Sequence, residues 1–229
     1  MEAARERLAA FGRTPTIEVG DTTGPLPGGE YDRILATVSV RPVPRSWLES
    51  LRPGGRIVTT IAGTSLLISA EMQDYGIARG RVQADPASFM RTRQEANYPP
   101  LLDEVYTGAR DAIGDDVRDL AGPLPNLWTD WQLRCLYELD SPKVENRSAT
   151  LDDGSEVIWL LGADGSWARA EGAGQVVHQS GPRRLWDDLE RVQQTWSSSG
   201  RFSLDHLRVE LSPEQSTLTS PNGRWTFTL

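Results

Sequence analysis

The sequence predicts an α/β fold for residues 1–94 and a small α+β module for residues 143–229. In the first part, apolar strands alternate with helical patterns and with loops rich in glycine and proline, which is typical of a parallel sheet. Its last two strands resemble a hairpin, so we expect the sheet to end in an antiparallel pair. In the second part, an amphipathic helix follows short apolar runs that are separated by turns.

Local signals define the elements of the first part. Ala4, Leu8 and Phe11 form one helical stripe that ends before Gly12. Pro44 is placed to open a second helix, and the tetrapeptide RPGG stops it. In chain order we expect a helix at 2–11, strands at 16–19 and 31–38, a helix at 44–51, a strand at 56–63, and a hairpin of strands at 65–72 and 76–90 that turns at Asp74–Gly76.

The remainder of the chain divides in two. Residues 95–142 hold prolines and acidic residues between short helical pieces, and we expect them to connect the two parts or to cover a substrate. Further on, D-G-S turns at Asp153 and Asp164 predict an antiparallel meander. Pro182 is placed to open the amphipathic helix, and strands at 206–211 and 224–229 are expected to complete the same module. The predicted apolar face of this helix comprises Leu185, Trp186, Leu189, Val192 and Trp196.

The composition excludes several classes of function. The chain of 229 residues carries a formal net charge of −8, which disfavours nucleic acid and anionic membranes as partners. Cys135 is the only cysteine, so an intramolecular disulfide and a cysteine metal cluster are impossible, and we expect a buried thiol. The N-terminal residues lack the apolar core of a signal peptide, and no apolar run reaches the length of a membrane span. We therefore expect a cytoplasmic protein.

Two ordered motifs carry a family resemblance. VGDTTG at 19–24, followed by YDRILATVSVRPVPRSWLESLRPGGRIVTTI at 31–61, resembles the second half of the protein-L-isoaspartate O-methyltransferase family. Members of that family are class I enzymes that depend on S-adenosylmethionine, so the resemblance, over residues 3–94, implies the C-terminal portion of a Rossmann-like sheet. FMRTR at 89–93 and SGPRRLWDDLE at 180–190 are similar to extended methyltransferases that accompany ATP-grasp peptide maturases. This second likeness implies a precursor peptide as substrate and an ATP-grasp maturase as partner.

The sequence departs from that family at the cofactor site. No G-x-G-x-G turn precedes a helix anywhere in the chain, and the acidic residue that would bind the ribose hydroxyls is also missing. Residues 2–11 resemble the helix that follows the second strand of the family, so we expect a polypeptide that lacks the N-terminal part. The family strand order then predicts an open edge on the strand at 34–38, unless the strand at 16–19 pairs with it directly.

Six residues are candidates for binding. By the resemblance, Asp21 contacts the adenine amino group of S-adenosylmethionine, next to Thr22, which replaces a family glycine; the alternative for Asp21 is an Asx turn. Thr37 and Ser39 lie at the carboxyl end of a strand, where ligands approach open α/β sheets, or they are ordinary strand-end hydroxyls. We assign Thr37 to the cofactor and Ser39 to the substrate. Arg183 and Arg184 are candidates for an acidic leader peptide, with surface charge as the alternative.

Other chemistries are less well supported. A triad of Ser180, His178 and Asp187 lacks the G-x-S-x-G turn that would hold the serine. His178 and His206 are the only histidines, and neither they nor the acidic residues have metal-ligand spacing, so no metal is expected.

Two hypotheses for function follow. The first is an O-methyltransferase of the isoaspartate type that acts on Asp or isoAsp carboxylates of a ribosomally made precursor peptide and lacks part of its cofactor site. The second is a non-catalytic remnant that binds the peptide or the maturase.

Overall fold

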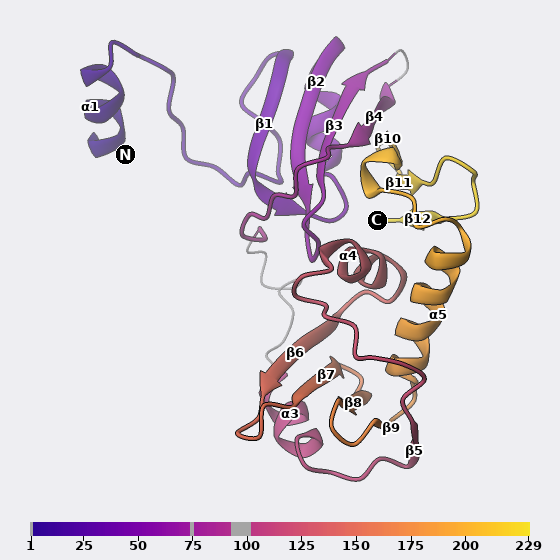
Figure 1. The fold of residues 1–229 in the computed structure, drawn as a ribbon. Helices are drawn as coiled ribbons and strands as arrows, with labels where there is room; N and C mark the ends of the chain where they lie inside the picture. Colours follow the sequence, from indigo (N-terminus) through magenta and orange to yellow (C-terminus); the bar gives the residue numbers. More distant parts are fainter. Residues whose placement is uncertain (1, 74–75, 93–101) are drawn as a thin grey trace.

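A computed structural model describes residues 2–73, 76–92 and 102–229. Within these residues the strands form two sheets, one of seven strands and one of five (Figure 1). One cluster of buried apolar side chains includes Ile57 of the first sheet, Leu160 of the second and Trp186 between them. The two sheets and the helices that separate them therefore share a core.

The seven-stranded sheet contains the segments in which the sequence predicted an α/β fold. Its strands are β1 (Tyr31–Val40), β2 (Leu51–Ile61), β3 (Leu67–Met72), β4 (Ala78–Val82), β10 (Arg208–Leu211), β11 (Ser216–Thr219) and β12 (Thr226–Thr228), in the order β1-β2-β3-β4-β10-β11-β12. β1 and β2 are parallel and are joined through α2 (Arg45–Glu49), whereas β2, β3 and β4 are antiparallel. This arrangement confirms the predicted α/β class and its antiparallel end. Most of the predicted hairpin turn at Asp74 lies outside the described residues.

The N-terminal arm differs from the prediction. The helix forms as α1 (Glu2–Ala10), but none of its residues is buried, and it lies away from the sheets (Figure 1). The strand predicted at 16–19 was wrong: these residues have no strand partner, and Val19 is 81% exposed. The β-branched residues of this segment favour extended backbone, but a strand needs a neighbour for its hydrogen bonds. Among the described strands, β1 therefore pairs only with β2. The predicted open edge is present at residues 34–38, but at Ser39 the segment 90–92 bridges to that edge.

The C-terminal strands also differ from the prediction. β10 pairs with β4, with Val209 opposite Gly80, so β10 to β12 extend the first sheet instead of completing the second. The physical reason is that β4 would otherwise present a row of unpaired N–H and C=O groups at a sheet edge. The predicted boundary at residue 94 lies outside the described residues, and the division into three domains stays a prediction.

The five-stranded sheet contains the predicted meander. Its strands are β5 (Asp116–Asp119), β6 (Val144–Thr150), β7 (Glu156–Gly162), β8 (Trp167–Glu171) and β9 (Val176–Ser180), in the antiparallel order β5-β9-β8-β7-β6. At both predicted turns an aspartate accepts a hydrogen bond from the backbone N–H two residues on: Asp153 from Ser155 and Asp164 from Ser166. The sequence D-G-S therefore predicted an Asx turn, in which the glycine lies between the aspartate and the N–H that it accepts from.

Helices cover this sheet and separate it from the first (Figure 1). α3 (Asp103–Ala109) packs on one face, where Tyr106 meets Trp159 edge to face. α4 (Trp131–Asp140) contacts α5 (Leu185–Ser198), and a 3₁₀ turn (Leu204–His206) leads to β10. All five residues predicted for the apolar face of α5 are buried. The amphipathic pattern thus identified both the helix and its buried face.

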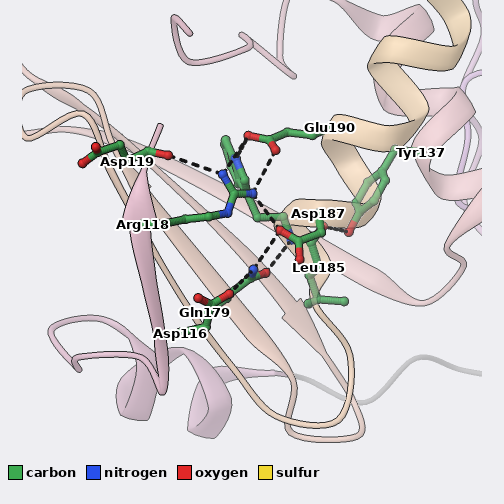
Figure 2. Close-up of polar contacts among 9 residues, drawn as sticks. Asp116, Arg118, Asp119, Tyr137, Gln179, Leu185, Asp187 and Glu190 are labelled. Atoms are coloured by element: carbon green, nitrogen blue, oxygen red, sulfur yellow. Dashed lines mark hydrogen bonds and ion pairs between the residues drawn. The ribbon is translucent and has the colours of Figure 1, made fainter. Parts of the chain in front are cut away.

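A polar network fastens α5 to β5 and β9 (Figure 2). Gln179 is fully buried, and its Nε2 donates to Asp116 Oδ2 and Asp187 Oδ1, both at 2.9 Å. Its Oε1 accepts from the backbone N–H of Trp186 at 3.2 Å. Arg118 of β5 lies between Asp187 and Glu190 of α5, with Nη2 at 2.7 and 2.8 Å from their carboxylates.

Replacement of Gln179 with leucine is expected to lower the free energy of unfolding by about 1–3 kcal/mol. The substitution leaves the first turn of α5 without a partner for the N–H of Trp186, in a buried position. Urea unfolding measures the change. Gln215→Leu is the matched control, because Gln215 is exposed and its side-chain amide donates to the hydroxyl of Thr228. Equal stability of the two variants would contradict this role of the network.

Candidate substrate site at the ends of β1 and β2

A cavity of about 230 Å³ lies where the parallel strands β1 and β2 end. Its lining residues are Thr23, Val40, Arg41, Pro42, Pro44, Ala62, Arg91 and Thr92. Val40 and Ala62 mark the carboxyl ends of the two strands, which is where ligands approach an open α/β sheet. The topology of the parallel pair therefore places this cavity in a position suited to a binding site.

Two loops close the sides of the cavity. The loop at 20–30 is held against α2, because Trp47 Nε1 donates to the carbonyl of Thr22 at 2.6 Å and Ser46 Oγ to that of Thr23 at 3.1 Å. The segment after β4 returns to the end of β1, where the backbone N–H of Thr92 donates to the carbonyl of Ser39 at 3.1 Å. Both loops are anchored by backbone groups, so the side chains at the cavity wall have defined positions.

Arg41 and Glu138 provide the main charges beside the cavity. Arg41 Nη1 lies 3.6 Å from Glu138 Oε1 and donates to the backbone carbonyl of Glu138 at 3.3 Å. Burial raises the pKa of Glu138 to about 7, although the Arg41 guanidinium favours the charged carboxylate. Burial also lowers the pKa of Arg41, and the nearby charge of Arg91 acts in the same direction. Gly63 makes room for the pair: a Cβ there would lie 2.5 Å from Glu138 Oε1.

None of the three residues predicted for the cofactor is among the described lining residues of the cavity: Asp21 and Thr22 precede the lining residue Thr23, and Thr37 lies on β1. Asp21 forms the alternative Asx turn, with Oδ1 accepting from the N–H and the hydroxyl of Thr23, both at 2.8 Å. Thr22 contributes its carbonyl to Trp47. Thr37 is exposed on β1, and its side chain makes no hydrogen bond among the described residues. Cofactor binding by these three residues stays a prediction.

The residues predicted for the substrate are separated from one another. Ser39 is 3% exposed, and its hydroxyl bonds to Thr60 Oγ1 and to the carbonyl of Phe89, both at 2.7 Å, so it serves the junction of β1 with the following loops. Arg183 and Arg184 precede α5 beside the second sheet, far from β1 in Figure 1. Arg184 pairs with Asp115 at 2.7 Å. Their substrate roles stay predictions, and the fold does not unite them with Ser39 at one site.

Two further candidates from the sequence, the thiol of Cys135 and the carboxylate of Asp187, have structural roles. Cys135 is buried as expected; burial raises the pKa of its thiol to about 11, and Sγ accepts from the N–H of Ser65 at 3.3 Å. Asp187 accepts from Arg118 and Gln179, and within the described residues it makes no hydrogen bond to His178. The Ser-His-Asp triad considered from the sequence, Ser180, His178 and Asp187, is therefore not assembled.

Sequence reasoning missed the charged residues of the cavity. Arg41, Arg91 and Glu138 come from three segments that are far apart in the chain. Arg41 directly follows an apolar strand and precedes a proline, and a cation at the carboxyl end of a strand is a signal that could have pointed to a site. Nothing local marked Arg91 or Glu138, because only the return of the loop after β4 and the packing of α4 bring them to Arg41.

Comparisons with known proteins support the resemblance. A protein-L-isoaspartate O-methyltransferase of Ignicoccus hospitalis is 40% identical over 62 residues, which are 26% of this chain and 29% of that protein. Protein-L-isoaspartate O-methyltransferase 1 of Archaeoglobus fulgidus is 32% identical over 80 residues, or 34% of this chain and 37% of that protein. A segment of this chain is thus similar in sequence to two protein-L-isoaspartate O-methyltransferases. No protein-family model matches the sequence.

The similarity to the isoaspartate methyltransferases is partial. The aligned segments span about a third of the length of the curated relatives: 29% of one and 37% of the other. A solved structure of a protein-L-isoaspartate O-methyltransferase aligns with 96% of this chain and with 64% of the solved chain, at 19% sequence identity and a TM-score of 0.43.

Among the described residues, none of the helices is long and apolar enough to cross a membrane.

Proposed function

We propose that this chain is part of an S-adenosylmethionine-dependent carboxyl methyltransferase of the isoaspartate type. The similarity to isoaspartate methyltransferases supports the reaction class. The observation that carries the proposal is that the loop at Asp21–Thr23 is held against α2 and contributes Thr23 to the cavity at the carboxyl ends of β1 and β2. A carboxylate acceptor is already a nucleophile, so methyl transfer to it depends mainly on the orientation of the two reactants and not on a general acid or base.

The donor set fits the cofactor only in part. Asp21 supplies a carboxylate acceptor for the adenine amino group, and the backbone of its loop is fixed by Trp47. The sequence holds no G-x-G-x-G turn for the methionine end. The residues present thus match the adenine end alone, and we derive no reaction step through the cofactor. When bound, S-adenosylmethionine supplies the methyl group.

The acceptor that we propose is an Asp or isoAsp carboxylate of a ribosomally made precursor peptide, with an ATP-grasp maturase as a partner. The sequence motifs at 180–190 support this narrower proposal. A non-catalytic module that binds the peptide is the outcome if the chain binds no cofactor.

Calorimetry with S-adenosylmethionine tests the proposal on the 229-residue chain. We expect a submillimolar dissociation constant, and we expect Asp21→Asn to weaken binding by about 10-fold. Asparagine keeps the Asx turn to Thr23 but replaces one acceptor oxygen with an amide donor that faces the adenine amine. Asp85→Asn is the matched control, because Asp85 is exposed in another loop. Absence of binding by the parent chain would sink the methyltransferase proposal for this chain.

A further inference from the structure

Two arginines, Arg41 and Arg91, line the cavity at the ends of β1 and β2, and among the described residues their guanidinium groups have donors without a partner. Arg41 makes its described contacts through Nη1 alone, to the side chain and the carbonyl of Glu138. Within residues 2–73, 76–92 and 102–229, the guanidinium of Arg91 has no hydrogen-bond or ion-pair partner. A guanidinium carries five N–H donors in a planar fork, so most of the donor capacity of the pair is open to a ligand.

The charges around these groups are unbalanced. Two arginines act on one carboxylate, Glu138, and the pKa of that carboxyl is raised by burial to about 7. At neutral pH, Glu138 is therefore only partly ionised, and the cavity wall carries a net positive charge. Like charges at a partly buried site repel each other more strongly than in water. An anion between Arg41 and Arg91 would relieve this repulsion.

The size and the lining of the cavity define the anion. At about 230 Å³, the cavity is smaller than the roughly 300–1,000 Å³ of pockets that bury drug-sized ligands. Val40, Pro42, Pro44 and Ala62 provide apolar contacts, and Thr92 adds a hydroxyl, whereas the hydroxyl of Thr23 is bonded to Asp21. A short aliphatic stem that ends in a carboxylate matches this combination, because the stem packs on the apolar wall while both oxygens face the guanidinium groups.

We infer that this cavity binds the carboxylate of an aspartyl residue in a peptide, with Arg41 and Arg91 as its cationic contacts. As a statement about the methyl acceptor, the inference rests on the proposed function. As a statement about binding, it requires no cofactor and is measured without one. Arg41 and Arg91 then determine the preference of the site for acidic peptides.

Titration with two blocked tripeptides tests the inference. The probes are acetyl-Gly-Asp-Gly-amide and acetyl-Gly-Asn-Gly-amide, each added to the full chain and followed by NMR. We expect the asparaginyl peptide to bind about 10- to 100-fold more weakly, because the charge-assisted hydrogen bonds are lost. Equal affinity for both peptides, or equal affinity for inorganic phosphate, would overturn the inference.

Variants locate the binding on the two arginines. Arg91→Gln is expected to weaken the binding of the aspartyl peptide by about 10-fold or more, and Arg41→Gln is expected to have the same effect. Arg91→Gln is decisive, because Arg91 belongs to no described ion pair and its loss leaves no buried charge without a partner. Arg45→Gln is the matched control: Arg45 lies four residues from Arg41, and its side chain is 66% exposed in a pair with Glu49. Unchanged affinity in Arg91→Gln would refute the assignment.

The two proposals fail in different ways. Binding of the aspartyl peptide without binding of S-adenosylmethionine would sink the proposed function and leave the carboxylate site in place. Binding of the cofactor with no selectivity for the aspartyl peptide would sink the carboxylate site and leave the proposed function in place.

Discussion

Replacement of Gly80 with alanine is expected to lower the free energy of unfolding by about 3 kcal/mol or more. Gly80 lies in β4 between β3 and β10, opposite Ala70 and Val209. A Cβ at this position would overlap the carbonyl oxygen of Ser69 and lie 2.6 Å from Cα of Ala70. Both are backbone atoms of a central strand, so relief of the overlap requires β3 and β4 to separate.

Urea unfolding of the full chain measures this effect as a shift of the midpoint. Gly28→Ala is the matched control, because a Cβ at Gly28 meets no atom within 4 Å. We expect the control to change the free energy of unfolding by about 0.5 kcal/mol or less. A change as small as that of the control in Gly80→Ala would show that β3 and β4 have room for the added methyl group, and would contradict the prediction.

Replacement of Glu138 with glutamine is expected to stabilise the protein above neutral pH. Burial raises the pKa of Glu138 in the folded chain from 4.5 to about 7, with the Arg41 guanidinium opposing the rise. The folded state therefore keeps a proton that the unfolded chain releases between these two values. Because the native state binds more protons there, the free energy of unfolding falls as the pH rises through this range.

The size of this effect follows from the pKa difference. The contribution is fully present below pH 4.5 and lost above pH 7, and it amounts to the order of 3 kcal/mol. Glutamine is neutral throughout, so the difference between the variant and the parent should grow from pH 4.5 to pH 7 and then level off. Glu49→Gln, at an exposed position on α2, should show no such growth. Parallel stability curves for Glu138→Gln and the parent would contradict the raised pKa.

Local patterns predicted those elements whose signals lie within a few residues. The stripe of α5 identified its buried face, since a helix repeats every 3.6 residues whatever its neighbours. The D-G-S turns identified the meander, because an Asx turn forms within its own segment. The motifs at 19–61 pointed to the isoaspartate methyltransferases, to two of which part of the chain is similar.

Predictions failed where strand pairing decided the outcome. The segment at 16–19 has suitable residues for a strand but finds no neighbour, whereas β10 joins β4, from which it is separated by more than a hundred residues. A strand is stabilised by hydrogen bonds to its partner, and no sequence pattern states which partner is available.

The sequence by itself determined the fold class, the helices and turns, and a partial similarity to protein-L-isoaspartate O-methyltransferases. The tertiary structure alone decided the mixed sheet that includes the C-terminal strands, and the cavity. Arg41, Arg91 and Glu138 meet there because a parallel strand end, a returning loop and α4 converge. Electrostatic interactions depend on distance and burial, and both are properties of the folded chain.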